Sequence, residues 1–328
     1  MTESDPIIYA YRLRGDGSAE QLDSDFSMSE QGDPIWVHLD AVSEISGEWL
    51  KRETNLGSYV IDGLLAEESR PRCDVYPHGV LIVLRGVNLN PGSDPEDMVS
   101  IRIWMDHERV ITTRFRRIMA VEDIVDQLEK GQGPTSTSHL VARLGFQLTE
   151  RMGPFISQID EEISELEDVL IAADHEQNID FRETRSELLR LRRLTIALRR
   201  FLAPQRIALA TLAGVERNWI SPSVMGRLRE VSDRVTRITE DLDEARERCV
   251  VIYDELSGRM SHRMERTMYL LTVVATIMLP LGFLTGLLGI NVAGIPGAES
   301  KSAFWVVCTL MGVLVAAEVW FFRKKKWI

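Results

Sequence analysis

Cysteine and histidine are sparse in this 328-residue sequence, and neither forms a recognisable site. The three cysteines, Cys73, Cys249 and Cys308, stand far apart, so they make no C-x-x-C pair and no disulfide framework. The six histidines form no H-x-H or H-E-x-x-H pair, which excludes the local motifs of zinc enzymes. No nucleophile beside a base, no acid–base pair and no phosphate-binding loop can be placed. We therefore expect neither an enzyme nor a bound cofactor.

Basic residues are in short supply over most of the chain. The net charge is −12, and only seven of the 38 basic and three of the 50 acidic residues lie from Arg263 onward, which leaves −16 for residues 1–262. An acidic body argues against nucleic-acid binding, because affinity for phosphates comes from basic groups, and it is compatible with gathering cations. The first ten residues also lack the basic and apolar regions of a signal peptide, so we expect this body to stay in the cytoplasm.

Against these absences stand two long apolar runs near the C-terminal end. Residues 268–288 carry no charge, and this run and residues 303–322 are each long enough to cross a hydrocarbon core of roughly 30 Å as a helix. Arginines precede the first run and residues 323–328 form a basic tail, so the positive-inside rule places both ends in the cytoplasm. We expect two transmembrane helices joined by an external loop at residues 289–302. Glu318 lies inside the second run, where it either matters to function or reaches toward the basic tail.

Residues 1–133 mix strand and helix patterns. Short β-rich segments bounded by Gly, Pro and Asp predict strands at residues 6–13, 34–39, 80–89, 99–104 and 109–115. Helical spacing predicts helices at residues 46–54, 59–67 and 120–130. The last two strands are expected to form a hairpin, and the whole segment an α+β cytoplasmic domain with a sheet of several strands.

Strand patterns end at the Gly- and Pro-containing break at residues 131–134, and residues 134–267 predict a helical domain with a long stalk. Residues 139–173 predict one acidic helix and residues 180–213 a basic one, and their opposite charges suggest an antiparallel pair. A third helix begins near Ser223. Its apolar positions follow steps of three and four, at Leu228, Val231, Val235, Ile238, Leu242, Ala245, Cys249, Ile252 and Leu256.

We call these nine positions the seam. A seam of this kind predicts a coiled coil with neighbouring helices. The simplest reading continues the helix through the first apolar run to Leu288, a length on the order of 100 Å. Because such a helix is too long to be buried within one small subunit, we expect copies of it to pack around a common axis.

Gly289, Ile290 and Asn291 end the first apolar run. A ring of Asn291 amides from several copies would hold the hydration shell of a divalent cation without binding it tightly, although a helix C-cap also explains an Asn after a Gly. Steps of three and four back from Asn291 predict an apolar constriction, which would gate by dewetting. It would be lined by Leu287, Leu284, Pro280, Ile277, Val273 and Leu270.

Small and acidic residues near this span have two interpretations each. Gly282 and Gly286 form a G-x-x-x-G pair, which suits close helix packing as well as ion passage. Asp254 and Glu265 lie at the cytoplasmic end, where they either attract cations to a pore mouth or belong to a solvated coiled-coil surface.

Together these residues resemble the CorA family of divalent-cation transporters. Magnesium-transporting members carry Gly-Met-Asn where this chain has Gly289-Ile290-Asn291, and Leu288 stands where a Tyr is usual. These departures, together with residues 291–297 and 85–100, resemble the ZntB zinc-transporter branch.

The resemblance implies a homopentameric funnel in the bacterial inner membrane, with the first span lining a central pore. It places Asn291 in the outer ring of the pore and Asp254 at the cytoplasmic pore mouth. It equates Pro280 with the proline of the family's first span, and Leu279 and Gly282 with the family's Met and Thr pore positions. It also implies movement of zinc, with cadmium and nickel as further substrates, coupling to protons, and either direction of transport. Two alternatives stay open: a magnesium or cobalt channel of the same architecture, and a membrane-anchored coiled-coil scaffold or sensor without transport.

Overall fold

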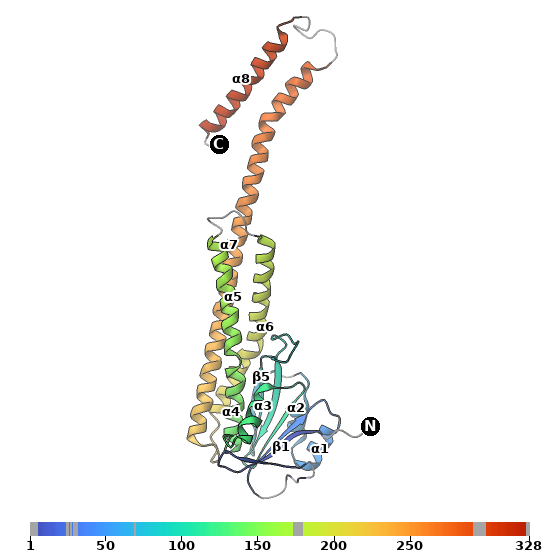
Figure 1. The fold of residues 1–328 in the computed structure, drawn as a ribbon, viewed down its shortest axis with the longest axis vertical. Coiled ribbons are helices and arrows are strands. Elements are labelled where there is room, and N and C mark those ends of the chain that lie inside the picture. Colours follow the sequence, from blue (N-terminus) through green and yellow to red (C-terminus); the bar gives the residue numbers. More distant parts are fainter. Residues whose placement is uncertain are drawn as a thin grey trace. The chain divides into compact units, whose positions relative to one another are not determined.

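The computed structural model describes residues 6–23, 26, 28, 32–68, 70–172, 180–290 and 300–325 (Figure 1). It consists of two units, Met1–Tyr253 and Asp254–Ile328. The first unit contains a sheet and several helices and is described here. The second consists of the apolar helices and is described with the candidate functional site.

A seven-stranded mixed sheet forms the N-terminal part of the first unit. Its strands are β1 (Ile7–Leu13), β2 (Ala19–Gln21), β3 (Ile35–Asp40), β4 (Arg72–Val75), β5 (Val80–Gly86), β6 (Val99–Met105) and β7 (Arg109–Arg114). They lie in the order β2-β1-β3-β7-β6-β5-β4, and β3 and β7 are the parallel pair. The predicted strands and the β6–β7 hairpin are confirmed. Strands β2 and β4 were not predicted. Both are short and polar, and each lies at an edge of the sheet, where its backbone pairs with a single neighbouring strand.

Helices cover both faces of this sheet, because its central strands are apolar on both sides. Helices α1 (Ile45–Glu53) and α2 (Ser58–Leu65) pack on one face over residues such as Leu81 and Ile111. Helices α3 (Met119–Glu129) and α4 (Thr137–Glu150) pack on the other over Ile82 and Ile103. Successive residues of β5 thus enter opposite cores, which confirms the predicted α+β domain.

The helix predicted over residues 139–173 is two helices, which corrects the expectation. Helix α4 ends at Glu150, and α5 (Gly153–Ala172) begins three residues later. Pro154 lacks the N–H that would continue the hydrogen bonding of α4, and a proline is tolerated in the first turn of a new helix. The apolar spacing runs through the break without a change of step, so periodicity alone could not reveal it.

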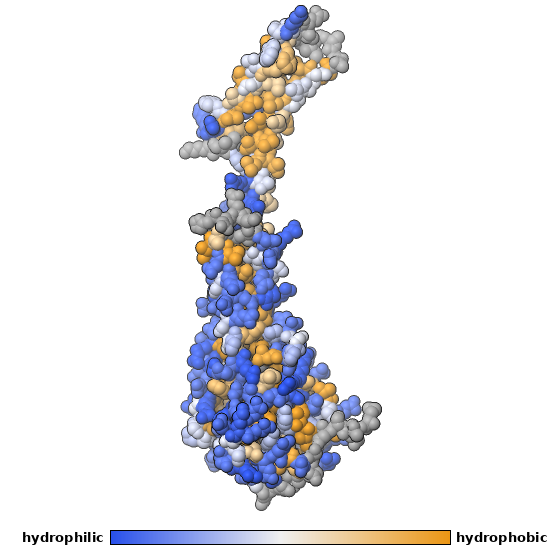
Figure 2. Space-filling view, viewed as in Figure 1, coloured by the Kyte–Doolittle hydropathy of each residue, from blue (hydrophilic) through white to orange (hydrophobic). Residues whose placement is uncertain are grey.

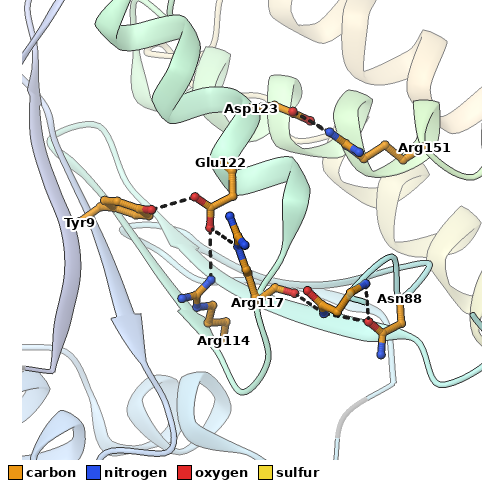
Figure 3. A network of polar contacts seen from close by, with 8 residues as sticks. Tyr9, Asn88, Arg114, Arg117, Glu122, Asp123 and Arg151 are labelled. Atoms are coloured by element: carbon orange, nitrogen blue, oxygen red, sulfur yellow. Dashed lines mark hydrogen bonds and ion pairs between the residues drawn. The ribbon is translucent and has the colours of Figure 1, made fainter. Parts of the chain in front are cut away.

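Polar contacts fix α3 against its neighbours (Figure 3). The Tyr9 hydroxyl of β1 donates a hydrogen bond to Glu122 of α3 at 2.8 Å, and Arg114 and Arg117 form ion pairs with the same carboxylate at 3.5 and 3.2 Å. Asp123 accepts two hydrogen bonds from Arg151, at 2.8 and 2.6 Å. Because Arg151 follows the last residue of α4, this bidentate pair anchors the break between α4 and α5 to α3.

Helices α5, α6 (Phe181–Ala213) and the start of α7 (Pro222–Leu288) form a bundle (Figure 1). The Asp180 side chain caps α6 by accepting the N–H of Arg182 at 2.9 Å. The predicted pairing of acidic α5 with basic α6 is present in the Arg190–Glu162 ion pair. Most of the remaining charge pairing involves α7, through Arg248 with α5 and Asp243 with α6.

Helix α7 confirms the prediction of one uninterrupted helix, and its seam is buried inside the chain's own fold. All nine seam residues have 5% or less of their surface exposed, and Leu228, Val231 and Val235 join the core that contains the sheet and α4. The seam therefore packs against helices of the same chain and is not free for other copies. Packing of copies around an axis requires a different face of α7.

Arg248 gives a test of how strongly α7 is held to α5. Its guanidinium donates to Glu167 at 2.9 and 2.7 Å and to Ser164 at 2.8 Å, and it pairs with Asp160. We expect Arg248→Met to lower the free energy of unfolding by about 1 kcal/mol, since the pair is bidentate but partly exposed. Thermal unfolding measures the loss. The control is Arg246→Met, which removes the same charge nearby on α7, and an equal loss there would contradict the assignment.

Candidate functional site

The apolar segments of the second unit, residues 268–288 and 303–322, present mostly apolar surface (Figure 2). The C-terminal part of α7 and helix α8 (Ala303–Lys324) are both long and apolar enough to cross a membrane. Large side chains such as Leu271, Leu279 and Phe283 are 65%, 72% and 66% exposed. Apolar surface on this scale requires lipid or other protein around it. The two helices coincide with the two predicted spans.

One stripe of α7 is partly shielded within the single chain. Val273, Ile277, Pro280, Leu281 and Leu284 are half-buried, whereas the other positions between 268 and 288 are exposed. Continuing the steps of the seam beyond Leu256 leads to this stripe. Half-buried positions recur on α8 at similar steps, including Val307, Met311, Leu314, Glu318 and Val319. Because α7 and α8 are the two helices that the structure describes in this unit, we infer that these stripes face each other.

The opposite side of α7 is exposed and carries small residues together with the large side chain of Leu279. It comprises Thr272, Ala275, Leu279, Gly282 and Gly286, each two residues, or about 200° of helical rotation, beyond a predicted constriction residue. We call these five positions the exposed stripe. A Cβ atom added at Gly282 or Gly286 would meet no atom within 4 Å. Among the described residues the G-x-x-x-G pair therefore makes no close contact, and the space beside it is available to other copies or to an ion path.

The predicted constriction residues lie mostly on the shielded side. Four of the six, Val273, Ile277, Pro280 and Leu284, are half-buried, while Leu270 and Leu287 are 57% and 50% exposed. Leu279 and Gly282, which the family resemblance favours, lie on the exposed stripe. The two assignments thus correspond to two different faces of one helix.

The threonine hydroxyl groups of this span are satisfied inside the helix. Thr272 donates to the Met268 carbonyl and Thr276 to the Thr272 carbonyl, both at 2.8 Å. Thr285 donates to the Leu281 carbonyl at 3.0 Å. Back-bonding of this kind lets a hydroxyl lie in an apolar environment without an outside partner.

Helix α7 ends where the predicted Gly289-Ile290-Asn291 motif begins. The Gly289 N–H donates to the Thr285 carbonyl at 2.9 Å, and a Cβ atom at residue 289 would lie 3.0 Å from that same oxygen. This close approach explains a glycine directly after the helix. Ile290 is 48% exposed, and Asn291 lies outside the described residues.

Charged residues gather in α7 just before the apolar span begins. Asp254 and Glu265, the predicted pore-mouth acids, are both exposed. His262 Nδ1 lies 3.5 Å from Glu265 Oε2, one helical turn away on the same face. Sequence inspection missed this pair, because H-x-x-E is absent from the common metal-site motifs, although its spacing places both side chains together on a helix. Among the described residues no group of three or more His, Cys, Asp and Glu side chains could hold a metal ion.

Glu318 of α8 lies among the half-buried positions. Its Oε2 atom is buried without a hydrogen-bond partner among the residues that the structure describes. Glu318 was expected to reach toward the basic tail, but this oxygen makes no hydrogen bond to the tail residues that the structure describes.

Comparison with known proteins identifies relatives over almost the whole chain. Residues 31–324 match the family described as CorA-like Mg2+ transporter protein. The divalent cation transporter CmaX of Pseudomonas aeruginosa is 39% identical over 329 residues, covering 98% of this chain and 97% of that protein. The zinc transport protein ZntB of Yersinia pestis is 34% identical over 321 residues, covering 98% and 96%.

Solved structures agree with this similarity. The structure of the full-length CmaX protein superposes with a TM-score of 0.84 at 37% identity, covering 98% of both chains. The CorA magnesium transporter from Methanocaldococcus jannaschii gives a TM-score of 0.80 at 20% identity, which shows a shared fold. A mixed-sheet domain, one very long helix and two apolar C-terminal helices are thus common to these proteins. The chain belongs to the CorA family of divalent-cation transporters.

Proposed function

We propose that the chain forms a homopentamer in the bacterial inner membrane and moves zinc across it. Residues 1–133 and 134–267 would be its cytoplasmic domains, residues 268–288 and 303–322 its spans, residues 289–302 the periplasmic loop and residues 323–328 a cytoplasmic tail. One observation carries this proposal: the exposed stripe of α7, which is small except at Leu279, lies on an apolar helix, and its two glycines have no neighbour within 4 Å among the described residues. Two spans enclose no pathway, whereas five copies of this stripe around an axis would.

The exposed stripe is the face we assign to the conduit. Half-burial of Val273, Ile277, Pro280 and Leu284 inside one chain supports this choice, because residues shielded by α8 are less free to face an axis. The alternative lining by Leu270, Val273, Ile277, Pro280, Leu284 and Leu287 stays a prediction. In either arrangement Gly289, Ile290 and Asn291 form the outer mouth and Asp254 and Glu265 the cytoplasmic one.

The His262–Glu265 pair favours zinc over magnesium. Imidazole nitrogen is a good ligand for zinc, while magnesium prefers oxygen ligands and keeps much of its water. Five copies of the pair would surround the cytoplasmic mouth with nitrogen and carboxylate donors. The zinc assignment also follows the ZntB relatives, which are named zinc transport proteins. Cadmium and nickel, which accept the same donors, would be further substrates, and a proton gradient would drive the flux.

Flux into liposomes that contain a zinc-sensitive dye tests this proposal. We expect zinc entry that Asn291→Ala reduces at least tenfold, because the amide ring is lost. His262→Gln should reduce zinc flux several-fold and leave magnesium flux unchanged. His107→Gln, which alters an exposed histidine of the β6–β7 hairpin, is the control. Absence of zinc flux under every pH gradient, together with strong block of magnesium flux by hexaamminecobalt, would replace zinc transport by a magnesium or cobalt channel.

A further inference from the structure

A cavity of about 610 Å3 opens at one end of the sheet in the first unit, far along the chain from the apolar span. The end of β5, the start of β6, the end of β7 and helix α6 contribute to its wall. Four arginines line it, Arg70, Arg85, Arg116 and Arg200. Its acidic residues are Glu67, Glu68 and Asp97. The transport proposal assigns this cavity no role.

A fifth arginine is buried against the cavity wall without a carboxylate. Arg102 of β6 is fully buried, and it donates to the carbonyls of Glu67 at 2.8 Å and Ser100 at 3.2 Å. Its guanidinium lies over the Phe115 ring, 4.5 Å from the centroid. All three contact residues line the cavity. Arg102 Nε has no hydrogen-bond partner among the described residues, so a positive charge lies directly behind the wall and its hydrogen bonds go to neutral carbonyl groups.

Two of the lining arginines crowd one aromatic ring. The Arg85 guanidinium lies 4.1 Å from the centroid of the Phe201 ring, and that of Arg200 lies 5.6 Å from the same centroid. The Gln205 side chain holds the Arg85 backbone by accepting its N–H at 2.6 Å and donating to its carbonyl at 3.0 Å. This clamp joins α6 to the end of β5, so the two guanidiniums are held in place by rigid elements.

Like charges therefore face one another across the cavity. Burial, together with the neighbouring charges of Arg85 and Arg72, lowers the pKa of Arg102 to about 10. Burial also lowers the pKa of Arg85, and Arg200 and Arg116 add to that effect, against Asp97 and Glu68. Five arginines against three acids give this region a positive surplus within a body whose net charge is −16 over residues 1–262. An anion in the cavity would relieve the repulsion.

We propose that this cavity binds a phosphorylated small molecule, with its phosphates on Arg85, Arg116 and Arg200. Guanidinium groups match phosphate oxygens in pairs and are the preferred phosphate ligands of proteins. A cavity of 610 Å3 falls in the range of sites for small organic ligands and is larger than a single phosphate requires. Asp97 pairs with Arg116 and would compete with the ligand.

Binding is measured by calorimetry on the purified full-length chain in detergent, with EDTA present, using inorganic phosphate, pyrophosphate and ATP as probes. We expect pyrophosphate and ATP to bind, and the affinity to fall with added salt. Arg200→Gln should weaken binding roughly tenfold, the cost of one charge-assisted contact. Arg193→Gln, which removes the same charge from an exposed site on α6 outside the cavity, should have no effect. Asp97→Asn should tighten binding several-fold, because it releases Arg116.

The two variants act in opposite directions, so a general loss of folding cannot imitate the result. Thermal unfolding without a probe verifies that each variant is folded. Equal binding of ATP and pyrophosphate would assign recognition to the phosphates, and tighter binding of ATP would add a nucleoside subsite. Failure of all three probes to bind the natural chain, or equal effects of Arg200→Gln and Arg193→Gln, would overturn the proposal. Because zinc flux is measured separately, either proposal can fail without the other.

Discussion

Replacing Gly282 by leucine should reduce zinc flux at least tenfold, whereas the same replacement at Gly312 should leave flux nearly unchanged. Both glycines lie in apolar helices, and at both a Cβ atom would meet nothing within 4 Å in the single chain. The two substitutions therefore have the same local cost and differ in what surrounds each helix. If the exposed stripe faces an axis, five leucines at position 282 would fill the space that the glycines leave open. A leucine at residue 312 of α8 would meet lipid.

The measurement is zinc entry into liposomes, with the mass of the detergent complex determined for each variant. A complex of unchanged mass shows that Gly282→Leu blocks passage and does not merely prevent assembly. Ile277→Ala alters a half-buried residue on the opposite side of α7 and should leave zinc flux largely intact. Equal zinc flux through Gly282→Leu and the natural chain would show that the exposed stripe does not line the conduit. A selective loss in Ile277→Ala would instead favour the lining by Leu270, Val273, Ile277, Pro280, Leu284 and Leu287.

Periodicity predicted which face of α7 is buried but not what buries it. The seam from Leu228 to Leu256 repeats in steps of three and four, and each of its members is buried. The same pattern arises whether a helix packs against its own chain or against copies of itself. Here the sheet, α4 and their neighbours in the same chain cover the seam. The pattern therefore reflects packing within one chain. The face available to other copies lies on the opposite side and has no apolar repeat to mark it.

Other features were invisible because they depend on contacts between distant segments. Strand β4 has the sequence RCDV, which carries no strand pattern and becomes a strand through pairing with β5. The arginine-lined cavity draws on residues from Glu67 to Phe201, and its buried member Arg102 sits in the apolar strand VSIRIWM. By contrast, the two spans and the start of α7 near Ser221 were predictable, since length, apolar content and a proline in the first turn are local signals.

Acid should destabilise the first unit through His38, and His38→Gln should remove much of that sensitivity. His38 is fully buried in β3, where Nδ1 lies 2.8 Å from Thr112 Oγ1 and the ring stacks on Tyr9. The Thr112 hydroxyl also lies 3.1 Å from the Val37 carbonyl, so its single proton cannot serve both partners. Nε2 is buried with no hydrogen-bond partner among the described residues. A second ring proton would therefore place a charge where nothing accepts it.

Burial, reinforced by the charge of Arg114, lowers the pKa of His38 from 6.5 to about 3. Between these two values the unfolded chain binds one more proton than the folded chain, so stability is complete above pH 6.5 and falls as the pH drops toward 3. The slope approaches about 1.4 kcal/mol per pH unit, or roughly 2–3 kcal/mol between pH 6.5 and 4.5. His139, whose pKa burial lowers to about 4, adds a smaller effect of the same sign.

Thermal unfolding from pH 7.5 to pH 4.5 measures this dependence as the difference between two curves, because carboxylates titrate equally in both proteins. His38→Gln keeps a group that can bond to Thr112 but does not titrate, so its melting temperature should fall less steeply with acid even if it starts lower. His107→Gln removes an exposed histidine and should follow the curve of the natural chain. Parallel curves for His38→Gln and the natural chain would mean that the buried ring is protonated without cost, which its surroundings of apolar and already bonded groups do not allow.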